Sequence, residues 1–356
     1  MGASPRVSVL MPVHNGERFV EEAVESILGQ TFGDYEFIIL DDGSTDDTGA
    51  ILRRCADPRI VRIDQGHSGL AASLNRGLSV ARGDYIARMD SDDRALPERL
   101  EREVAFLDRH PEVGIVGTAF RPIDQNGRVG ELRRLPQEHI DIRWASLLAN
   151  PFAHPTVAFR RDLLDRHGLS YDGWLAAVED YDLWTRMLRH TRGANLREPL
   201  LHYREHGASV TGRQREMQLR NHDAIAFRTI REVISSSEIS LSEVSRLRCL
   251  FTAGDERESG PESRRAEIAE HYLDLLDAFI ELCPGEAGVG ALRRREALRV
   301  ARLALRPPLP SGWRRLLGRA LAMDPGLPWR FLADLSMAAG RRLRRSLNAT
   351  QPGPTR

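Results

Sequence analysis

Three carboxylates stand close together in the stretch DYIARMDSDD, at residues 84–93. Asp90, Asp92 and Asp93 follow directly on Tyr-Ile-Ala-Arg-Met, a run typical of a buried strand. Carboxylates in such a cluster repel one another unless a cation neutralises them. Hard oxygen ligands favour Mg²⁺ or Mn²⁺, which commonly bind one or two carboxylates together with diphosphate oxygens. The stretch therefore predicts a divalent-ion site that faces the phosphates of a nucleotide.

Two structural readings of the same stretch stay open. The carboxylates can belong to an acidic surface loop, or one of them can cap the helix expected from Pro97, and Asp93 suits that capping role. Asp90 and Asp92 are two residues apart, which in extended backbone turns both side chains to the same side. We therefore expect these two to act together.

A second acidic group, Glu179, Asp180 and Asp182, lies in AVEDYDLWTRM at the start of an expected helix, 178–190. A carboxylate placed beside an attacking hydroxyl can accept its proton as a general base. Acidic residues are also common in the first turn of a helix, where they interact favourably with its dipole. The spacing alone favours that structural reading.

The elements that would carry these residues alternate in type along the first 120 residues. Strands are expected at 6–13, 35–40, 59–64, 84–89 and 113–120, and helices at 17–30, after 41–48, at 68–82 and from Pro97. This alternation predicts an α/β fold whose mostly parallel sheet has helices on both faces. Three strands end in polar stretches, MPVHNGE, DDGSTDD and MDSDD, at the edge where ligands of such sheets bind.

The remainder of the chain predicts a change of architecture. Residues 136–206 give a mixed signal, with helices at 137–149 and 178–190 and strands at 156–161 and 200–206. Beyond Thr211 only helical patterns follow, at 213–234, 240–252, 262–283, 290–306 and 326–347. We predict an α/β domain at 1–210, a C-terminal helical annex at 211–347 and a disordered tail at 348–356.

Four segments, in order along the chain, closely resemble family-2 glycosyltransferases of the Rossmann-like GT-A fold. They are the run that starts at Ser8, the run that starts at Gly69, the DSDD stretch that ends it and the run that starts at Val178. The resemblance covers about residues 6–206. It implies an inverting enzyme that moves one sugar from a nucleotide-diphosphate donor, most simply a UDP-sugar, to a hydroxyl of a saccharide or lipid-linked acceptor during glycan biosynthesis. It also implies a Mn²⁺ or Mg²⁺ ion.

The resemblance assigns roles to individual residues. The backbone at Pro12 and Val13 and the side chain of Asp41 would hold the base, with Asn15, Ser44 and Asn75 lining the same pocket. Asp90, Ser91 and Asp92 match the metal motif, with Asp92 the direct ligand. Asp180 would be the base, Glu179 would contact or orient the acceptor, and Asp182 would be structural.

Two histidines and an arginine have more than one reading. His206 stands where some relatives place a histidine near the metal or the diphosphate, but an ordinary surface histidine fits the sequence nearly as well. His154 belongs to a recurrent segment that shapes the acceptor side. Arg204 can neutralise phosphate or pair with neighbours on a strand surface.

Two departures from the family pattern qualify the resemblance. His14 takes a position that is often tyrosine, so the stacking of the base is expected to differ. Arg143-Trp144 does not match the Gln-x-x-Arg-Trp motif of processive synthases, because Ile140 stands where glutamine would be and the pair precedes the Glu-Asp motif. We therefore expect one sugar per encounter.

The composition of the chain limits the binding partners and the location that we expect for the protein. The 51 basic and 51 acidic residues cancel, so we expect no nucleic-acid partner. The chain has no apolar run of about 18 residues, its start lacks the apolar stretch of a signal peptide, and Cys55, Cys249 and Cys283 are scattered. We expect a cytoplasmic protein. The basic amphipathic helix at 326–347 leaves peripheral contact with the inner face of the cell membrane open, although we favour a packed helix. A homodimer is also open.

Two competing functions remain beside the glycosyltransferase. A nucleotidyltransferase usually has a glycine-rich loop with arginine and lysine after its first strand, whereas PVHNGERF has one glycine and no lysine. A nucleotide-binding scaffold or pseudo-enzyme with the same fold is the other alternative. The presence of Asp41, Asp92 and Asp180 argues against it.

Overall fold

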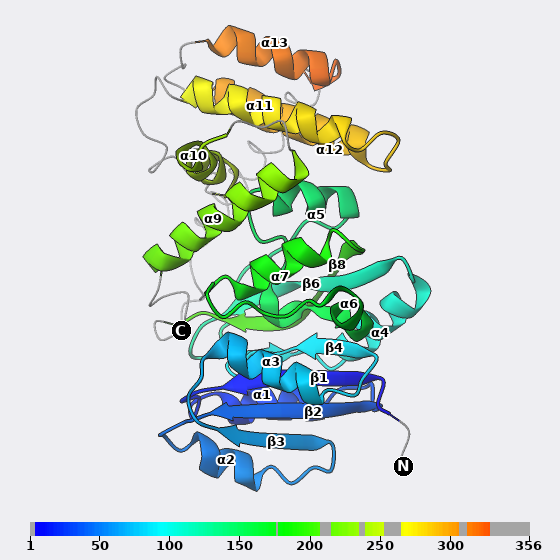
Figure 1. Cartoon of the computed structure of the whole chain (residues 1–356), viewed down its shortest axis with the longest axis vertical. Coiled ribbons are helices and arrows are strands. Elements are labelled where there is room, and N and C mark those ends of the chain that lie inside the picture. Colours follow the sequence, from blue (N-terminus) through cyan, green and yellow to red (C-terminus); the bar gives the residue numbers. More distant parts are fainter. Residues whose placement is uncertain are drawn as a thin grey trace, which may run out of the picture. The chain divides into compact units, whose positions relative to one another are not determined.

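The computed structural model describes residues 4–175, 177–206, 215–234, 239–252, 265–305 and 312–327. The chain forms two compact units, residues 1–244 and residues 245–356. The first unit contains the sheet and every residue singled out above for chemistry. Figure 1 shows its strands stacked side by side, with helices packed against them.

An eight-stranded sheet, with the order β3-β2-β1-β4-β7-β6-β8-β5, organises the first unit. The strands in chain order are β1 (Val7–Val13), β2 (Tyr35–Asp42), β3 (Ile60–Gln65), β4 (Tyr85–Arg88), β5 (Arg94–Ala95), β6 (Val113–Ile123), β7 (Ala158–Arg160) and β8 (Arg192–Arg204). Only β7 and β5 run antiparallel to their neighbours. The predicted mostly parallel sheet is therefore confirmed.

Helices cover both faces of this sheet, as the sequence predicts. Side chains of β1 alternate between two cores, with Val9 and Met11 in one and Leu10 in the other. The core of Val9 includes α1 (Val20–Leu28), α2 (Thr48–Arg54) and α4 (Arg99–Arg109). The core of Leu10 includes α3 (Leu70–Val80), α5 (His139–Ser146), α6 (Arg161–His167) and α7 (Glu179–Met187). Strands buried on both faces explain the nearly continuous apolar runs of the sequence.

Several short elements differ from the prediction. The expected strand at 156–161 is only three residues long, because a 3₁₀ turn (His154–Thr156) precedes it and α6 begins at Arg161. Gly168, with φ of +60°, ends α6, and this left-handed glycine is the local signal for that helix. The two-residue β5 has too little pattern to be found in a sequence.

Helices alone follow β8 in the described residues. Helix α9 (Arg215–Val233) belongs to the first unit, and α10 (Leu241–Thr252) spans the boundary between the units. The second unit contains α11 (Arg265–Glu281), α12 (Val289–Ala304) and α13 (Trp313–Met323), of which α13 was not predicted. None of the helices within the described ranges is long and apolar enough to cross a bilayer.

The domain limits and the C-terminal helix stay predictions. Strand β8 ends at Arg204, six residues before the expected domain end at 210, whereas the first compact unit extends to Val244. Almost all of the basic helix expected at 326–347 and the whole tail at 348–356 lie outside the described residues.

Candidate active site

The acidic stretch after β4 forms a compact group. Asp90, Asp92 and Asp93 each place a carboxylate oxygen within 4.8 Å of the others. The side chains of Asp90 and Asp92 are about one third exposed, so an ion can reach them. Burial and the charge of Asp90 raise the pKa of Asp92, which is the expected effect of unneutralised neighbours. An all-oxygen donor set under such repulsion fits Mg²⁺ or Mn²⁺.

Asp93 is not a helix cap. Helix α4 begins at Arg99 after Glu98, whereas the buried Asp93 side chain accepts a hydrogen bond of 2.7 Å from the backbone N–H of Arg204. Its Oδ2 atom is buried and has no hydrogen-bond partner among the described residues. Burial, Asp90 and Asp92 together raise the pKa of Asp93 well above its usual range. A buried oxygen in this state supports a cation or a proton at the cluster.

Arg204 fixes the acidic stretch to β8. Its Nε donates to the carbonyl of Asp92 at 2.7 Å and its Nη1 to the carbonyl of Asp124 at 3.2 Å. Its Nη2 forms an ion pair with Glu22, and its guanidinium lies over the ring of Phe19 at 4.3 Å. Arg204 is buried, so the reading as a strand-surface residue is wrong, and its donors are engaged within the protein.

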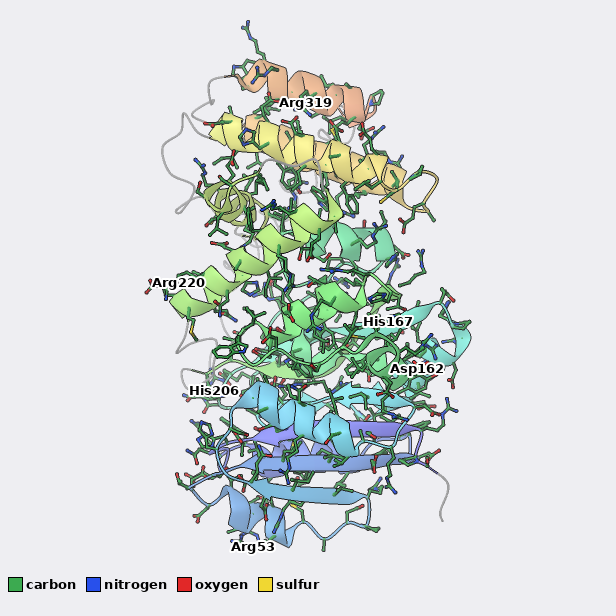
Figure 2. The ribbon with its side chains drawn as sticks, in the orientation of Figure 1. Arg53, Asp162, His167, His206, Arg220 and Arg319 are labelled. Atoms are coloured by element: carbon green, nitrogen blue, oxygen red, sulfur yellow. The ribbon has the colours of Figure 1, made fainter. Side chains whose placement is uncertain are left out.

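His206 lies at the acidic group, as the resemblance implies. Its Nε2 is 2.8 Å from Oδ2 of Asp92, and its ring is 5.3 Å from that of Phe19 between centroids. Figure 2 labels His206 just beyond the end of β8. The reading as an ordinary surface histidine is therefore wrong, while direct metal ligation by His206 stays a prediction.

The second acidic group lies at the start of α7. Asp180 accepts hydrogen bonds of 2.7 Å from Nδ2 of Asn150 and from the backbone N–H of Tyr181. Burial nevertheless raises the pKa of Asp180 to about 6. Burial and the nearby Asp180 raise the pKa of Glu179 to about 7. Asp182 differs, because it pairs with Arg186 and Arg228, which fits the structural role expected of it.

Arg88 links the two acidic groups electrostatically, and sequence reasoning missed it. Its side chain is 1% exposed and forms an ion pair with Asp90. The same positive charge lowers the pKa of both Glu179 and Asp180, opposing the effect of their burial. A buried cation needs compensating anions, so a lone arginine at the end of a buried strand was the available signal.

His154 also lies close to Asp180. Its Nδ1 is 4.0 Å from Oδ2 of Asp180, and its Nε2 is 3.2 Å from the hydroxyl of Tyr171. Burial, reinforced by Arg88, lowers its pKa well below the usual range, so the imidazole is neutral. His154 therefore orients its neighbours without adding charge.

The loops after β1 and β2 are tied together at the same sheet edge. Pro12 and Val13 end β1, and Asn15, with φ of +52°, turns the chain away from it. The N–H of Asn15 donates to Oγ of Ser44 at 3.0 Å, and the N–H of Ser44 donates to Asp41 at 2.9 Å. Three of the predicted donor-binding residues, Asn15, Ser44 and Asp41, are thus brought together at the end of β1.

An open cavity of about 380 Å³ adjoins these loops on the α2 side. Arg53 is its one basic residue and is labelled in Figure 2. The lining residues are Asp41, Gly43, Ser44, Asp46, Asp47, Gly49, Ala50, Arg53, Asp64 and Gln65. Asn75, which the resemblance places in the base pocket, is not among the residues that line this cavity. Its amide instead bonds the backbone C=O and N–H of Tyr171, at 2.8 and 2.9 Å.

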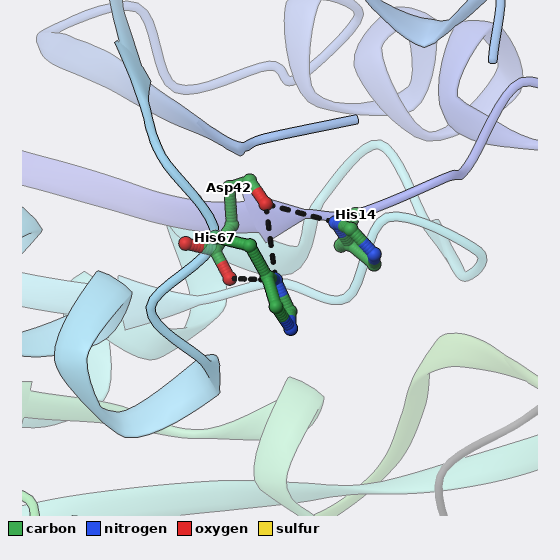
Figure 3. Close-up of side chains that lie close together, drawn as sticks. All are labelled: His14, Asp42 and His67. Carbon is green, nitrogen blue, oxygen red and sulfur yellow. Dashed lines mark hydrogen bonds and ion pairs between the residues drawn. The ribbon is translucent and has the colours of Figure 1, made fainter. Parts of the chain in front are cut away.

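A histidine-aspartate cluster, formed by His14, Asp42 and His67, was not predicted (Figure 3). Adjacent strand residues face opposite ways, so Asp42 points away from the cavity that Asp41 lines. Nδ1 of His14 is 2.8 Å from the carbonyl of Asp42, and Nδ1 of His67 is 3.0 Å from its Oδ2. The two rings lie 4.2 Å apart. The polar ends of three neighbouring strands were the signal for this cluster.

The hydrogen-bond network around His14 indicates which of its ring nitrogens carries the hydrogen. Oδ1 of Asn15 accepts from the N–H of Thr45, so the amide Nδ2 faces Nε2 of His14 at 3.3 Å. Nε2 is therefore the acceptor, and Nδ1 carries the hydrogen and donates to Asp42. A metal ion at Nδ1 would displace that hydrogen. The cluster is consequently a hydrogen-bonded support for the strand ends, although its atoms lie close enough to hold an ion.

Comparison with known proteins gives a consistent result. Residues 8–168 match the family model described as glycosyl transferase family 2. The chain is similar to the putative glycosyltransferase EpsE of Bacillus subtilis (strain 168), with 39% identity over 213 residues, 58% of this chain and 75% of that protein. It is also similar to the O-antigen biosynthesis glycosyltransferase WbnJ of Escherichia coli, with 36% identity over 57% of this chain and 81% of that protein.

A third relative and a solved structure extend the comparison. The amylovoran biosynthesis glycosyltransferase AmsE of Erwinia amylovora is 36% identical over 51% of this chain and 69% of its own length. The crystal structure of S. aureus TarS 1–349 in complex with UDP-GlcNAc has a TM-score of 0.55 and 17% identity, covering 91% of this chain and 92% of that one. At this identity the structural likeness shows the fold alone.

Proposed function

The chain belongs to glycosyl transferase family 2 and is a glycosyltransferase, and from this premise we propose that it transfers single sugars with inversion, with the help of a divalent metal ion. The donor would be a UDP-sugar, and the acceptor a hydroxyl of a saccharide or lipid-linked molecule. One observation carries the proposal: a carboxylate cluster suited to a cation, and the partly buried Asp180 with its raised pKa, both interact electrostatically with the buried Arg88.

The donor would bind at the carboxyl ends of β1, β2 and β4. Mn²⁺ or Mg²⁺ would be held by Asp92, Asp90 and His206 and would neutralise negative charge on the departing diphosphate. The tied loops after β1 and β2 support a nucleoside site. The residues proposed to line it are Pro12, Val13, Asn15, Asp41, Ser44, Asn75, Asp90 and Ser91.

Asp180 is the proposed base. It would take the proton of the acceptor hydroxyl as that oxygen bonds to the anomeric carbon, while the bond from this carbon to the diphosphate breaks. One displacement of this kind inverts the configuration at the anomeric carbon. A pKa of about 6 leaves Asp180 ionised near neutrality yet basic enough to accept a proton. Glu179, one residue away, would orient the acceptor.

We place the proposed transfer in glycan biosynthesis. WbnJ and AmsE are named for O-antigen and amylovoran biosynthesis, which supports an acceptor on the way to a cell-envelope polysaccharide. We propose a cytoplasmic location, and contact with the inner face of the membrane would suit a lipid-linked acceptor. Nucleic acid is not among the proposed partners, and a homodimer is compatible with the proposal.

The first test is calorimetric titration of UDP, GDP and dTDP, with and without Mn²⁺. The proposal expects UDP to bind best, Mn²⁺ to strengthen its binding, and Asp92→Asn to remove that metal-dependent gain. A matched control is Asp162→Asn, an exposed carboxylate on α6 that pairs with Arg166. If no nucleotide binds under either condition, the donor site is wrong and a scaffold with the same fold becomes the better description.

A further inference from the structure

Trp174 is the most exposed large apolar side chain among the described residues. Its relative exposure is 94%, whereas no other exposed large hydrophobic exceeds 50%. An indole in water forgoes the burial that normally stabilises tryptophan, which is usually largely buried. A single exposed apolar residue needs no special explanation, so the position and rigidity of Trp174 must decide its role.

The turn that presents Trp174 is held firmly on its N-terminal side. Tyr171 is buried, and the amide of Asn75 bonds both its N–H and its C=O. Asp172 then closes the turn, because its Oδ1 accepts the N–H of Trp174 at 2.9 Å and its carbonyl accepts the N–H of Leu175 at 3.3 Å. The backbone of Trp174 is thus fixed by local hydrogen bonds.

The C-terminal side of the turn is fixed as well. Leu175 packs against the buried cluster of Val178, Tyr181 and Ile225. Ala177 has φ of +65°, a conformation that L-residues rarely adopt, and its carbonyl accepts a hydrogen bond of 3.1 Å from Gln218 on α9. Leu175 therefore faces the core while its neighbour Trp174 faces solvent from an anchored support.

Both ends of this turn lead to the proposed base. Tyr171 contacts His154, whose Nδ1 lies 4.0 Å from Asp180, and Glu179 begins α7 two residues after Ala177. Trp174 therefore stands on an anchored backbone turn that runs directly into the helix of the proposed base. An aromatic side chain on such a fixed backbone is well suited to bind a substrate, because little backbone entropy is lost on binding. Apart from Asn75 on α3, the residues proposed for the donor lie instead at the ends of β1 and β2 and in the loops after β1, β2 and β4.

We propose that Trp174 forms an acceptor subsite and stacks its indole on the apolar C–H face of a pyranose ring. A pyranose has one apolar face and a polar rim, so a flat aromatic ring can bind the face while the hydroxyls stay hydrated. This inference rests on the proposed function, since it assigns the acceptor of that reaction to the surface beside Asp180. Trp174 would position the ring so that one hydroxyl reaches the base.

Binding is tested without turnover by ¹⁹F NMR of protein labelled with 5-fluorotryptophan. The chain has five tryptophans, and the spectrum of Trp174→Phe identifies the Trp174 signal. Methyl β-D-glucopyranoside, methyl β-D-galactopyranoside and methyl α-D-mannopyranoside are titrated in the presence of UDP and Mn²⁺. We expect a saturable shift of the Trp174 signal with at least one glycoside, while the buried Trp144 and Trp184 signals stay in place.

Two results would overturn the subsite. One is an unchanged Trp174 signal with all three glycosides at millimolar concentration. The other is a shift produced by phosphatidylglycerol vesicles and by none of the glycosides, which would assign the indole to a membrane surface.

Kinetics give an independent readout with the glycoside that binds. Trp174→Ala should raise the acceptor KM on the order of tenfold, Trp174→Phe should recover much of the loss, and the affinity for UDP should stay unchanged. Trp313→Phe on α13 is the matched control. An unchanged acceptor KM in Trp174→Ala contradicts the inference. A protein that shifts the Trp174 signal but never releases UDP contradicts the proposed transfer and still supports the subsite.

Discussion

Asn150 donates a hydrogen bond of 2.7 Å to the Oδ2 atom of Asp180, from a loop that joins α5 to the 3₁₀ turn. This bond favours the charged form of a carboxylate whose burial opposes charge. Asp180 is thereby both oriented and kept near the ionisation range that a base requires.

Replacing Asp180 tests the proposed base directly. Asp180→Asn should reduce transfer by about 10²-fold or more, because proton removal from the acceptor is lost. UDP affinity in the presence of Mn²⁺ should stay within about twofold, since Asp180 lies outside the proposed donor site. Rates of UDP release and calorimetry measure the two effects. Transfer at the wild-type rate in Asp180→Asn would show that another group is the base.

Removing the Asn150 donor should shift the pH dependence of transfer. In Asn150→Ala the charged form of Asp180 loses a hydrogen bond, so the pKa of Asp180 rises and the acid limb of the rate profile moves to higher pH. The profile of kcat/KM against pH measures this shift. An unchanged acid limb would show that the ionisation of Asp180 does not control the rate.

Arg88 should influence the pH dependence in the same direction. In Arg88→Met the positive charge that lowers the pKa of Glu179 and Asp180 is lost, so the acid limb should again move to higher pH. The same change leaves Asp90 without its ion-pair partner, which should also destabilise the fold. Arg88→Lys restores a charge without the planar fork and should recover part of the profile. Equal profiles for the methionine and lysine variants would rule out a charge effect.

The free energy of unfolding should fall as pH rises through the range in which Glu179 loses its proton. Glu179 has an ordinary pKa of 4.5 that is raised to about 7 in the folded protein, so the folded state binds a proton that the unfolded chain has released. Its contribution is fully present below about pH 4.5 and is lost as pH rises through 7. Glu179→Gln should therefore stabilise the protein at pH 8 relative to wild type, by on the order of 2 kcal/mol. Urea unfolding at pH 5 and pH 8 measures the difference, which should be smaller at pH 5.

Arg204 should matter for both fold and metal affinity. Arg204→Lys keeps a charge but cannot reach Asp92, Asp124 and Glu22 together, so we expect a loss on the order of 3 kcal/mol in the free energy of unfolding. The acidic stretch would be less well ordered, and more Mn²⁺ would be needed for half-maximal UDP binding. Arg220→Lys, an exposed arginine on α9, is the matched control. Unchanged Mn²⁺ dependence would limit Arg204 to a purely structural role.

The sequence predicted the sheet well because its strands are buried on both faces. Runs such as Val7–Val13 carry a strong apolar signal, and the acidic stretch after Arg88 stands out at the end of such a run. The meeting of Asp92 with His206 was expected from the family resemblance, and the structure places the two side chains 2.8 Å apart.

Other features depend on contacts between distant parts of the chain. Asp42 and Asp41 look alike in the sequence, and only the pleat of β2 decides which one meets His14 and His67. The sequence around Arg204 does not indicate that its guanidinium donates to Asp92 and Glu22, which are far from it along the chain. Helix α13 follows a proline-rich stretch, which hid its start.

Strand β6 separates, along the sequence, two groups of proposed site residues that lie together in the folded protein. The residues proposed to hold the donor nucleotide lie within 12–92, before β6, and those proposed for the acceptor lie within 150–180, after it. His206 is the exception, since it returns to Asp92 from beyond β8. With these proposed roles, the preference for the donor and the preference for the acceptor depend on two separate stretches of the sequence. Recombination between relatives within β6 would pair one donor with a new acceptor, which is a simple route to diversity of linkage.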